Sequence, residues 1–354
     1  VIKNDIKLYG KDILNQFYSD FCVWDRNNDG KMGIVLTPDD IVDLMVTKSF
    51  DYYYQFNKEP NPKVIDFCTG TGSFLIKCSK FTNSLYGCEC GDERYSLCKC
   101  NFILNDLDVK NLSYGSCFNI NYQSDYFDIS IINPPFNNKC KDELNPNNIT
   151  NWKSLTKEQR FIMYQVMLLK VNGIGCCIVP RSNFNNNTKN VNNFKHEFMK
   201  YVKILSYYKC NSKVFMPNAS VECVIIIYQK INKLDNPIES KDVEVINYFD
   251  DGYKLKKNIR VKYSEPNLLV SNKTLKWDDD FNDNDEDNNY PDIKKLLKLN
   301  EIDKFYYEIK NTLNSDLIMK LYDKVTNIDK LNIIKWNKIK ISDYFEIVKV
   351  KPLK

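Results

Sequence analysis

The sequence predicts an α/β protein with a largely parallel sheet. Short apolar runs alternate along the chain with segments of helical periodicity, the order that parallel strands and crossover helices require. A Gly-x-Gly turn at 68–72 separates one apolar run from a helical segment. Another apolar run ends in Asn-Pro-Pro-Phe at 133–136, and prolines end a strand because they lack the backbone donor.

The expected elements follow one another in a regular order. A helix is expected at 11–24, and Thr37-Pro38 predicts the start of another, with Thr37 as N-cap and Pro38 at the first helical position. Strands are expected at 63–67, 84–89, 127–132, 173–179, 201–207 and 221–229, with helices from Ser73, at 92–104 and at 157–171. Later in the chain we expect a small β extension at 243–260, a polar, acidic loop at 263–290 and helical periodicity at 291–326.

Composition restricts the class of protein. The 354 residues are enough for two or three domains, and 43% of them are apolar. No apolar run reaches the roughly 18 residues of a membrane span, and no secretory signal pattern is found, so no membrane contact is expected. The 13 cysteines are an odd number in a long chain, which predicts reduced thiols in a cytoplasmic, intracellular compartment.

The charge is unevenly distributed. A net charge of +4 does not by itself indicate a nucleic-acid-binding protein. Residues 278–287 are strongly acidic, however, and residues 253–262 are strongly basic. The basic stripe suits a nucleic-acid face, and it suits a solvated surface equally well.

The turn from Asp66 to Gly72, DFCTGTG, has the form of a cofactor-binding turn. Its glycines let the backbone approach a ligand closely, and it lacks the Gly-Lys-Ser/Thr of a Walker loop. Glu89 follows about 20 residues later at the end of the next expected strand, where an acid suits a ribose with two free hydroxyls. A tight packing turn is the alternative.

The stretch Asn133-Pro134-Pro135-Phe136 suits methyl transfer to an exocyclic amino group. An adenine amino nitrogen is a poor nucleophile because its lone pair is delocalised into the ring. The Asn133 side-chain oxygen and the Pro134 carbonyl can accept its two hydrogens and localise the lone pair toward a donor methyl group. The prolines fix that carbonyl, and Phe136 can stack on a base rotated out of the duplex.

Residues 10–260 resemble the N6-adenine DNA methyltransferases of the gamma arrangement, above all type I modification subunits and type IIG enzymes. The Thr37-Pro38 segment resembles the motif that flanks the cofactor, VIDFCTGTGSFL the cofactor loop, and LYGCE the ribose-binding segment. NPPF resembles the catalytic loop. Phe215, in VFMPNASVECVIIIYQK, matches the aromatic residue that stacks on the flipped base.

The resemblance implies a class I S-adenosylmethionine-dependent methyltransferase fold, a seven-stranded, mostly parallel sheet with helices on both faces. It implies methyl transfer from S-adenosyl-L-methionine to the N6 amino group of a flipped adenine in double-stranded DNA, within a restriction-modification system. The implied cofactor residues are Thr37, Pro38, Asp66, Cys68, Gly70, Gly72, Glu89, Ser116 and Asn133. The implied catalytic residues are Asn133, Pro134, Pro135 and Phe136, with Phe136 and Phe215 stacking on the target base. Ser116 replaces the acid that the family often has after a glycine, and a hydroxyl accepts a more weakly held bond from the cofactor adenine.

A second resemblance lies at residues 336–345, which look like the start of a target-recognition domain of the type I specificity kind. We expect the rest of that domain in a separate specificity subunit or in a C-terminal continuation. The chain then divides into an N-terminal helical segment with the cofactor-flanking motif (1–50), the catalytic core (51–232), a β and acidic extension (233–290), and a helical connector with the start of the recognition domain (291–354).

Other interpretations stay open at this point. An RNA or protein-glutamine methyltransferase uses the same amide chemistry, and a DNA-binding assembly subunit that is inactive without its specificity partner would carry the same motifs. The Cys-x-Cys pairs at 88–90 and 98–100 lack the usual zinc-knuckle spacing. An EF-hand-like segment from Asp25 has Leu36 where a bidentate Glu is required, so no metal is expected.

Overall fold

The computed structural model describes residues 36–136, 145–146, 148–186, 188–212, 214–215, 221–256, 259–264 and 266–278. The helix expected at 11–24, most of the EF-hand-like segment, the helical periodicity at 291–326 and the segment 336–345 lie outside these residues.

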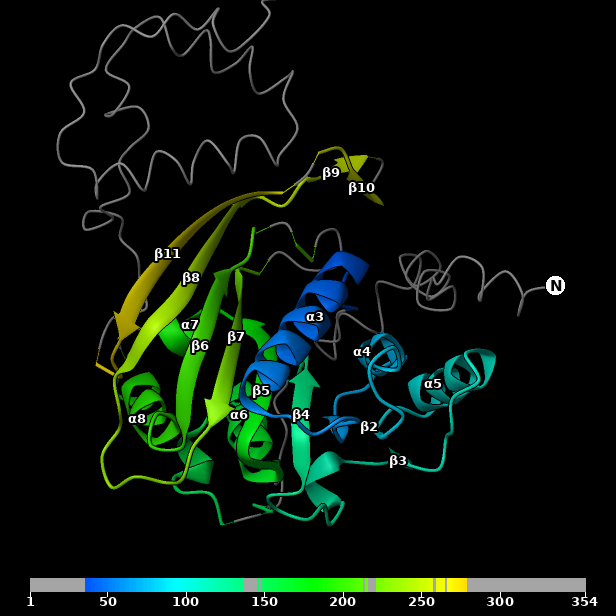
Figure 1. The fold of residues 1–354 in the computed structure, drawn as a ribbon, viewed down its shortest axis with the longest axis horizontal. Coiled ribbons are helices and arrows are strands. Elements are labelled where there is room, and N and C mark those ends of the chain that lie inside the picture. The colour runs from blue at the N-terminus through cyan, green and yellow to red at the C-terminus, as the bar shows by residue number, and fades with distance from the viewer. Residues whose placement is uncertain are drawn as a thin grey trace, which may run out of the picture. The chain divides into compact units, whose positions relative to one another are not determined.

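A nine-stranded sheet forms the centre of the fold, in the order β11-β8-β6-β7-β5-β4-β1-β2-β3 (Figure 1). Strands β1 to β5 run parallel to one another, whereas β7 is antiparallel to both β5 and β6. The strands are β1 (Val64–Asp66), β2 (Leu85–Glu89), β3 (Leu112–Tyr114), β4 (Phe127–Ile132), β5 (Leu169–Pro180), β6 (Val202–Lys209), β7 (Cys223–Lys230), β8 (Ser240–Asp250) and β11 (Asn267–Leu275).

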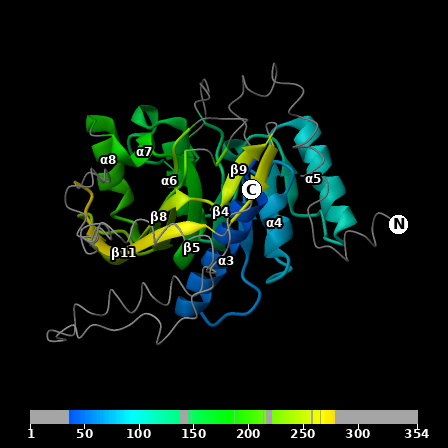
Figure 2. The same ribbon diagram turned by 90° about the horizontal axis from the view of Figure 1, so that it is seen from above.

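Helices cover both faces of this sheet, as Figure 2 shows from above. Alternate side chains of the central strands point to opposite faces and enter two separate hydrophobic clusters. One cluster includes α3 (Asp39–Phe56), α4 (Ser73–Cys78) and α5 (Asp92–Leu104). The other includes α6 (Lys157–Leu168), α7 (Ser182–Asn185) and α8 (Lys189–Phe198).

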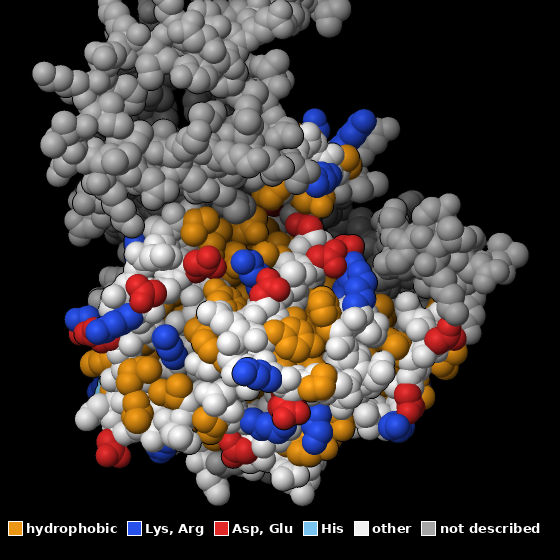
Figure 3. Space-filling model, in the orientation of Figure 1, with side chains coloured by type: hydrophobic (Ala, Val, Ile, Leu, Met, Phe, Trp, Pro, Cys, Tyr) orange, Lys and Arg blue, Asp and Glu red, His pale blue; other side chains and the backbone are white. Residues whose placement is uncertain are grey.

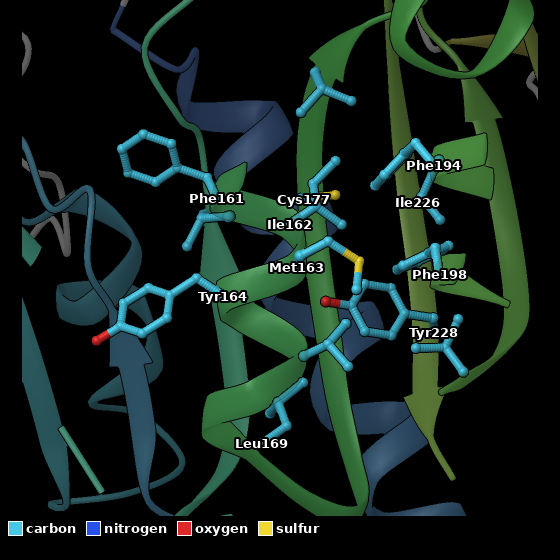
Figure 4. Packing of buried hydrophobic residues seen from close by; sticks show 14 of the residues in the cluster. Phe161, Ile162, Met163, Tyr164, Leu169, Cys177, Phe194, Phe198, Ile226 and Tyr228 are labelled. Carbon is cyan, nitrogen blue, oxygen red and sulfur yellow. The ribbon is translucent and has the colours of Figure 1, made fainter. Parts of the chain in front are cut away.

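The cluster under α6 and α8 is aromatic. In Figure 4, Phe161 and Tyr164 of α6 and Phe194 and Phe198 of α8 lie over the sheet, with Tyr228 of β7 between the helices. Phe198 and Tyr228 meet edge to face with ring centroids 5.1 Å apart. Such pairs hold the crossover helices to the sheet through both burial and ring geometry.

A polar network crosses the same cluster. The Gln165 Nε2 of α6 donates to the Ser130 carbonyl at 2.8 Å and to the Cys176 carbonyl at 3.1 Å, so it ties β4 to β5. The Tyr228 hydroxyl donates to Gln165 Oε1 at 2.8 Å. Gly175 makes room for this tyrosine, because a Cβ at that position would overlap its ring. The buried amide of Gln165 therefore has partners for both its oxygen and its nitrogen.

The class I methyltransferase fold expected from the sequence is confirmed, with a correction in strand number. Seven strands, in the order β6-β7-β5-β4-β1-β2-β3, make the expected mixed sheet, and β8 and β11 extend it to nine. The predictions of a helix at 92–104 and a strand at 127–132 coincide with α5 and β4. Helix α6 ends at Leu168 rather than 171, because β5 already begins at Leu169.

The polar loop expected at 263–290 was wrong in part, since residues 267–275 form β11. An edge strand pairs on one side only, so its apolar pattern is weaker than that of a central strand. The small β extension expected at 243–260 is present as β8 and a separate antiparallel pair, β9 (Tyr253–Lys256) and β10 (Ile259–Lys262).

Candidate active site

Three site segments meet at the carboxyl edge of the sheet. β1 ends at Asp66, β2 ends at Glu89, and β4 leads into Asn133. Because β2, β1 and β4 are adjacent and parallel, these ends lie side by side. The carboxyl edge of such a sheet is where open α/β folds bind their ligands.

The turn after β1 has two glycines with different roles. Gly72 has φ +92° at the N-cap of α4, and a Cβ there would press against Cys98 and Phe102, so this glycine lets α4 pack on α5. Gly70 has φ +56°, and a Cβ there would meet no protein atom within 4 Å. The open side of the turn is therefore at Gly70, where a ligand can approach the backbone.

Asp66 is fully buried and only half satisfied. Its Oδ1 accepts a bond from the Cys68 backbone N–H at 2.9 Å, while its Oδ2 is buried without a hydrogen-bond partner. Burial is the main cause that raises the pKa of Asp66 to about 8; the Cys68 N–H opposes this shift, and the nearby Glu89 contributes to it. A buried, unpartnered carboxylate oxygen suits a cationic or hydrogen-donating ligand.

Glu89 joins the turn to α5. Its Oε2 accepts from the Gly70 N–H at 2.9 Å, and its Oε1 accepts from the Gly91 N–H at 2.7 Å. Arg94, buried like Glu89, donates its Nε–H to the same Oε1 at 3.1 Å. Gly91 is required at its position because a Cβ would overlap the guanidinium.

Arg94 is a site residue that the sequence analysis missed. The available signal was a cation in the first turn of α5, five residues after an acid at the end of a strand. Arg94 forms an ion pair with Glu89 and fixes the direction of its carboxylate through a charge-assisted bond.

Thr37 contacts the amide of Asn133 across 96 residues of sequence. The Asn133 Nδ2 donates to the Thr37 Oγ1 at 2.8 Å. The prediction of Thr37 as the N-cap of α3 was wrong: the cap is Pro38, and the helix begins at Asp39. The Thr37 hydroxyl instead holds the amide at the end of β4.

The start of α3 is fixed beside this contact by Lys77 of α4. Its Nζ lies 3.3 Å from Asp39 Oδ1 and 2.9 Å from Asp43 Oδ1, and its side chain is 9% exposed. Thr37 therefore precedes a helix whose first residues are joined to α4 by the Lys77 ion pairs.

The two predicted stacking rings come together. Phe136 and Phe215 meet edge to face with centroids 5.8 Å apart, and they are 4% and 2% exposed. Pro134, which follows Asn133 and precedes Phe136 by two residues, is also buried. A base can reach the faces of these rings only when the pair opens.

Ser116 lies at the same edge, after β3. It follows Gly115, which has φ +127°. A Cβ added at Gly115 would meet no protein atom within 4 Å. The Gly115 N–H donates to the Glu89 carbonyl at 3.0 Å, which places Ser116 next to the end of β2. The structure thus brings the residues expected from the sequence to one edge.

In the described part of the chain, no group of three or more His, Cys, Asp or Glu side chains is arranged to hold a metal ion. Cys88 and Cys98 are buried, whereas Cys90 and Cys100 are exposed. None of the described helices has the length and apolar character needed to cross a bilayer.

Comparisons with known proteins agree with this geometry. The chain is 26% identical over 266 residues to the Type II restriction enzyme and methyltransferase RM.BcgI of Heyndrickxia coagulans. The matched region covers 70% of this chain and 39% of that protein. This chain thus spans well under half of that curated relative.

Two solved structures share the fold. The methyltransferase subunit of a type I restriction-modification system from Streptococcus thermophilus has a TM-score of 0.52 at 18% identity, over 72% of this chain and 55% of that one. A modification subunit of a putative type I restriction enzyme from Vibrio vulnificus has a TM-score of 0.51 at 17% identity, over 66% of this chain and 50% of that one. The family model for N-6 DNA methylase matches residues 10–321, and the chain therefore belongs to the N-6 DNA methylase family.

Proposed function

We propose that the chain is the catalytic part of an S-adenosyl-L-methionine-dependent DNA methyltransferase that modifies the N6 amino group of adenine. Its family and its relatives support this function and a role in restriction-modification, which is a cytoplasmic role. The single observation that carries the proposal is the Asn133 amide, held by Thr37 at the end of β4 and followed by two prolines.

The residues at the carboxyl edge fit the cofactor. S-Adenosyl-L-methionine carries positive charge at its sulfonium and its ammonium, and Asp66 offers a buried oxygen without a partner. Gly70 and Gly115 leave open space beside the backbone. The residues that would hold the cofactor are Thr37, Pro38, Asp66, Cys68, Gly70, Gly72, Glu89, Ser116 and Asn133. The bound cofactor supplies a methyl group on a positively charged sulfur.

The protein's part in the reaction is to prepare the amino group. In this proposal the Asn133 Nδ2 donates to the Thr37 hydroxyl, which orients the amide, and the amide oxygen accepts one amino hydrogen of the substrate. The Pro134 carbonyl accepts the other, and it is held in one direction because a residue before a proline is confined to extended backbone. The nitrogen lone pair would then be directed at the cofactor's methyl group. As the C–N bond formed, the methyl–sulfur bond would break, the sulfur would keep that electron pair and become neutral, and the nitrogen would release one proton to water.

The aromatic pair holds the target base in this proposal. Phe136 and Phe215 are in contact without a base, and extrusion of the adenine separates them so that a ring face becomes available. A specificity subunit or recognition domain selects the sequence, as the type I relatives suggest.

The test is methyl transfer from labelled S-adenosyl-L-methionine to double-stranded DNA of mixed sequence, with and without an added specificity subunit. Digestion to nucleosides locates the label. Label in N6-methyladenine is the expected result. Label in cytosine, or no label in DNA together with label in RNA or in a glutamine side chain when these are offered as substrates, would contradict the proposal.

A further inference from the structure

The β9–β10 hairpin rises from the same edge of the sheet as the catalytic loop. β8 is parallel to β6, β6 and β5 are both antiparallel to β7, and β5 is parallel to β4, so β8 and β4 point the same way. The hairpin begins at Tyr253, three residues after the end of β8. Figures 1 and 2 both show it beyond this edge, in yellow on the side of α3 and α4.

The root of the hairpin is fixed rather than loose. Asp251 Oδ1 accepts from the Tyr253 N–H at 3.0 Å, and the Gly252 carbonyl accepts from the Tyr263 N–H at 2.8 Å. Tyr248, near the end of β8, packs against the hydrophobic cluster that contains Ile41 and Val42 of α3. Burial raises the pKa of Tyr248, and Cys210, Asp40 and Asp251 add smaller contributions. The first turn of α3 directly follows Thr37, the partner of the Asn133 amide.

The hairpin is basic over its whole length. Residues 253–264 contain four lysines and one arginine and no acidic residue. Lys254 and Lys256 alternate along β9 on one face, and both are exposed. Among the residues that the structure describes, neither forms an ion pair with a carboxylate, and Lys254 lies 5.2 Å from the centroid of the Tyr263 ring. Figure 3 shows Lys and Arg side chains in blue at the position that the hairpin has in Figure 1.

We propose that the β9–β10 hairpin binds the phosphate backbone of the substrate DNA beside the target-base site. The proposal rests on the proposed function, since it assigns a contact for that substrate. The two exposed ammonium groups of Lys254 and Lys256 are complementary to a polyanion and would release its condensed counterions. Phosphate contacts position the duplex without reading its sequence, so this contact is independent of any recognition domain.

The test compares two matched double variants of the full chain. Lys254→Ala/Lys256→Ala removes the hairpin charges. Lys58→Ala/Lys80→Ala removes two exposed lysines from the connections that enter the amino ends of β1 and β2, on the opposite edge. Fluorescence anisotropy with a labelled duplex of mixed sequence, titrated at several salt concentrations, measures non-specific affinity. S-Adenosyl-L-methionine affinity reports whether each variant is folded.

The hairpin variant is expected to lose duplex affinity by roughly tenfold at about 0.1 M salt, and its log–log salt slope should fall by about 2. Lys254→Arg/Lys256→Arg and the opposite-edge variant should bind like wild type. In methyl-transfer assays the hairpin variant should raise KM for DNA and keep kcat, whereas Asn133→Ala lowers kcat and keeps duplex affinity.

Equal affinity and salt slope in the two alanine variants would overturn the hairpin proposal, and so would a wild type that binds no duplex. The proposed function fails separately, if wild type transfers no methyl group to the N6 position of adenine in any DNA. Methyl transfer by wild type together with unchanged binding by the hairpin variant would overturn the hairpin contact alone.

Discussion

Two buried polar clusters of this protein differ in how completely their polar atoms are hydrogen-bonded. In the interior, Gln165 has partners for its nitrogen on β4 and β5 and for its oxygen on Tyr228. At the carboxyl edge, Asp66 keeps one oxygen buried without a partner. Both clusters are removed from water to a similar extent, so burial alone does not explain the difference.

The difference separates a structural role from a ligand-binding one. An unsatisfied buried group costs free energy of folding, and native proteins accept that cost mainly at functional sites. The interior network contributes stability and joins neighbouring strands. The carboxyl-edge cluster holds a carboxylate in a form that only a ligand completes. The comparison therefore predicts that substitutions in the carboxyl-edge cluster weaken cofactor binding, whereas substitutions in the interior network lower stability and leave cofactor binding unchanged.

Glu89→Gln should have the largest effect. It leaves the buried Arg94 without its counter-charge, which costs about 3 kcal/mol of stability, and it should lower S-adenosyl-L-methionine affinity by roughly a hundredfold. Chemical denaturation measures the loss of stability, and calorimetric titration measures the loss of cofactor affinity. Glu89→Gln/Arg94→Leu is the control: it should recover stability and not affinity. Recovery of both would assign Glu89 a structural role only.

Gln165→Leu should destabilise the protein by about 2–3 kcal/mol, because it leaves the Tyr228 hydroxyl and two strand carbonyls without this partner. Cofactor affinity should stay at the wild-type value, measured where the variant is folded. A loss of affinity that exceeds the loss of folded protein would show that the two clusters are coupled.

Asp66→Asn should change the pH dependence of stability. The folded-state pKa of Asp66, about 8, lies above its ordinary value, so the folded state binds the proton more tightly and wild-type stability declines as pH rises toward 8. Between the ordinary pKa of 3.8 and the folded-state pKa of about 8, the free energy of unfolding falls with a slope that approaches about 1.4 kcal/mol per pH unit. The asparagine variant should lack this decline and bind the cationic cofactor about tenfold more weakly. Denaturation midpoints at pH 5, 6, 7 and 8 test it, and identical pH profiles would refute the assignment.

Thr37→Val should have the smallest effect, a fall in kcat of about tenfold, because the Asn133 amide loses the acceptor that orients it. Thr37→Ser keeps a hydroxyl and should retain most of the activity. A higher KM for the cofactor at unchanged kcat would instead assign the hydroxyl to cofactor binding.

The fold was largely predictable from the sequence because its central strands are short, apolar and separated by clear helix signals. The run before Asn133 and the helix that begins at Asp92 have such signals, and both were placed correctly. β11 was missed because an edge strand buries little apolar surface, and its residues alternate polar and apolar only weakly.

The positions of the candidate site residues at the strand ends were predictable, whereas the contacts between them were less so. The acid, glycine and Asn-Pro-Pro-Phe patterns have recognisable spacing, but the Thr37–Asn133 bond joins residues 96 positions apart. Arg94 has no motif of its own, and its role follows only from the packing of α5 against the end of β2. Long-range pairing of polar side chains is set by tertiary structure, which spacing along the chain does not encode.

The central claim is that the amide at the end of β4 acts on the substrate and not on the stability of the fold. Single-turnover methyl transfer to adenine in DNA, by wild type, Asn133→Ala and Asn57→Ala, tests it most directly. Asn57 is the matched control, since its side-chain amide bonds only to the carbonyls of Tyr53 and Asn172 among the described residues. We expect Asn133→Ala to lose at least a hundredfold in rate with its free energy of unfolding unchanged, and Asn57→Ala to keep its rate. Wild-type rates in Asn133→Ala would contradict the account.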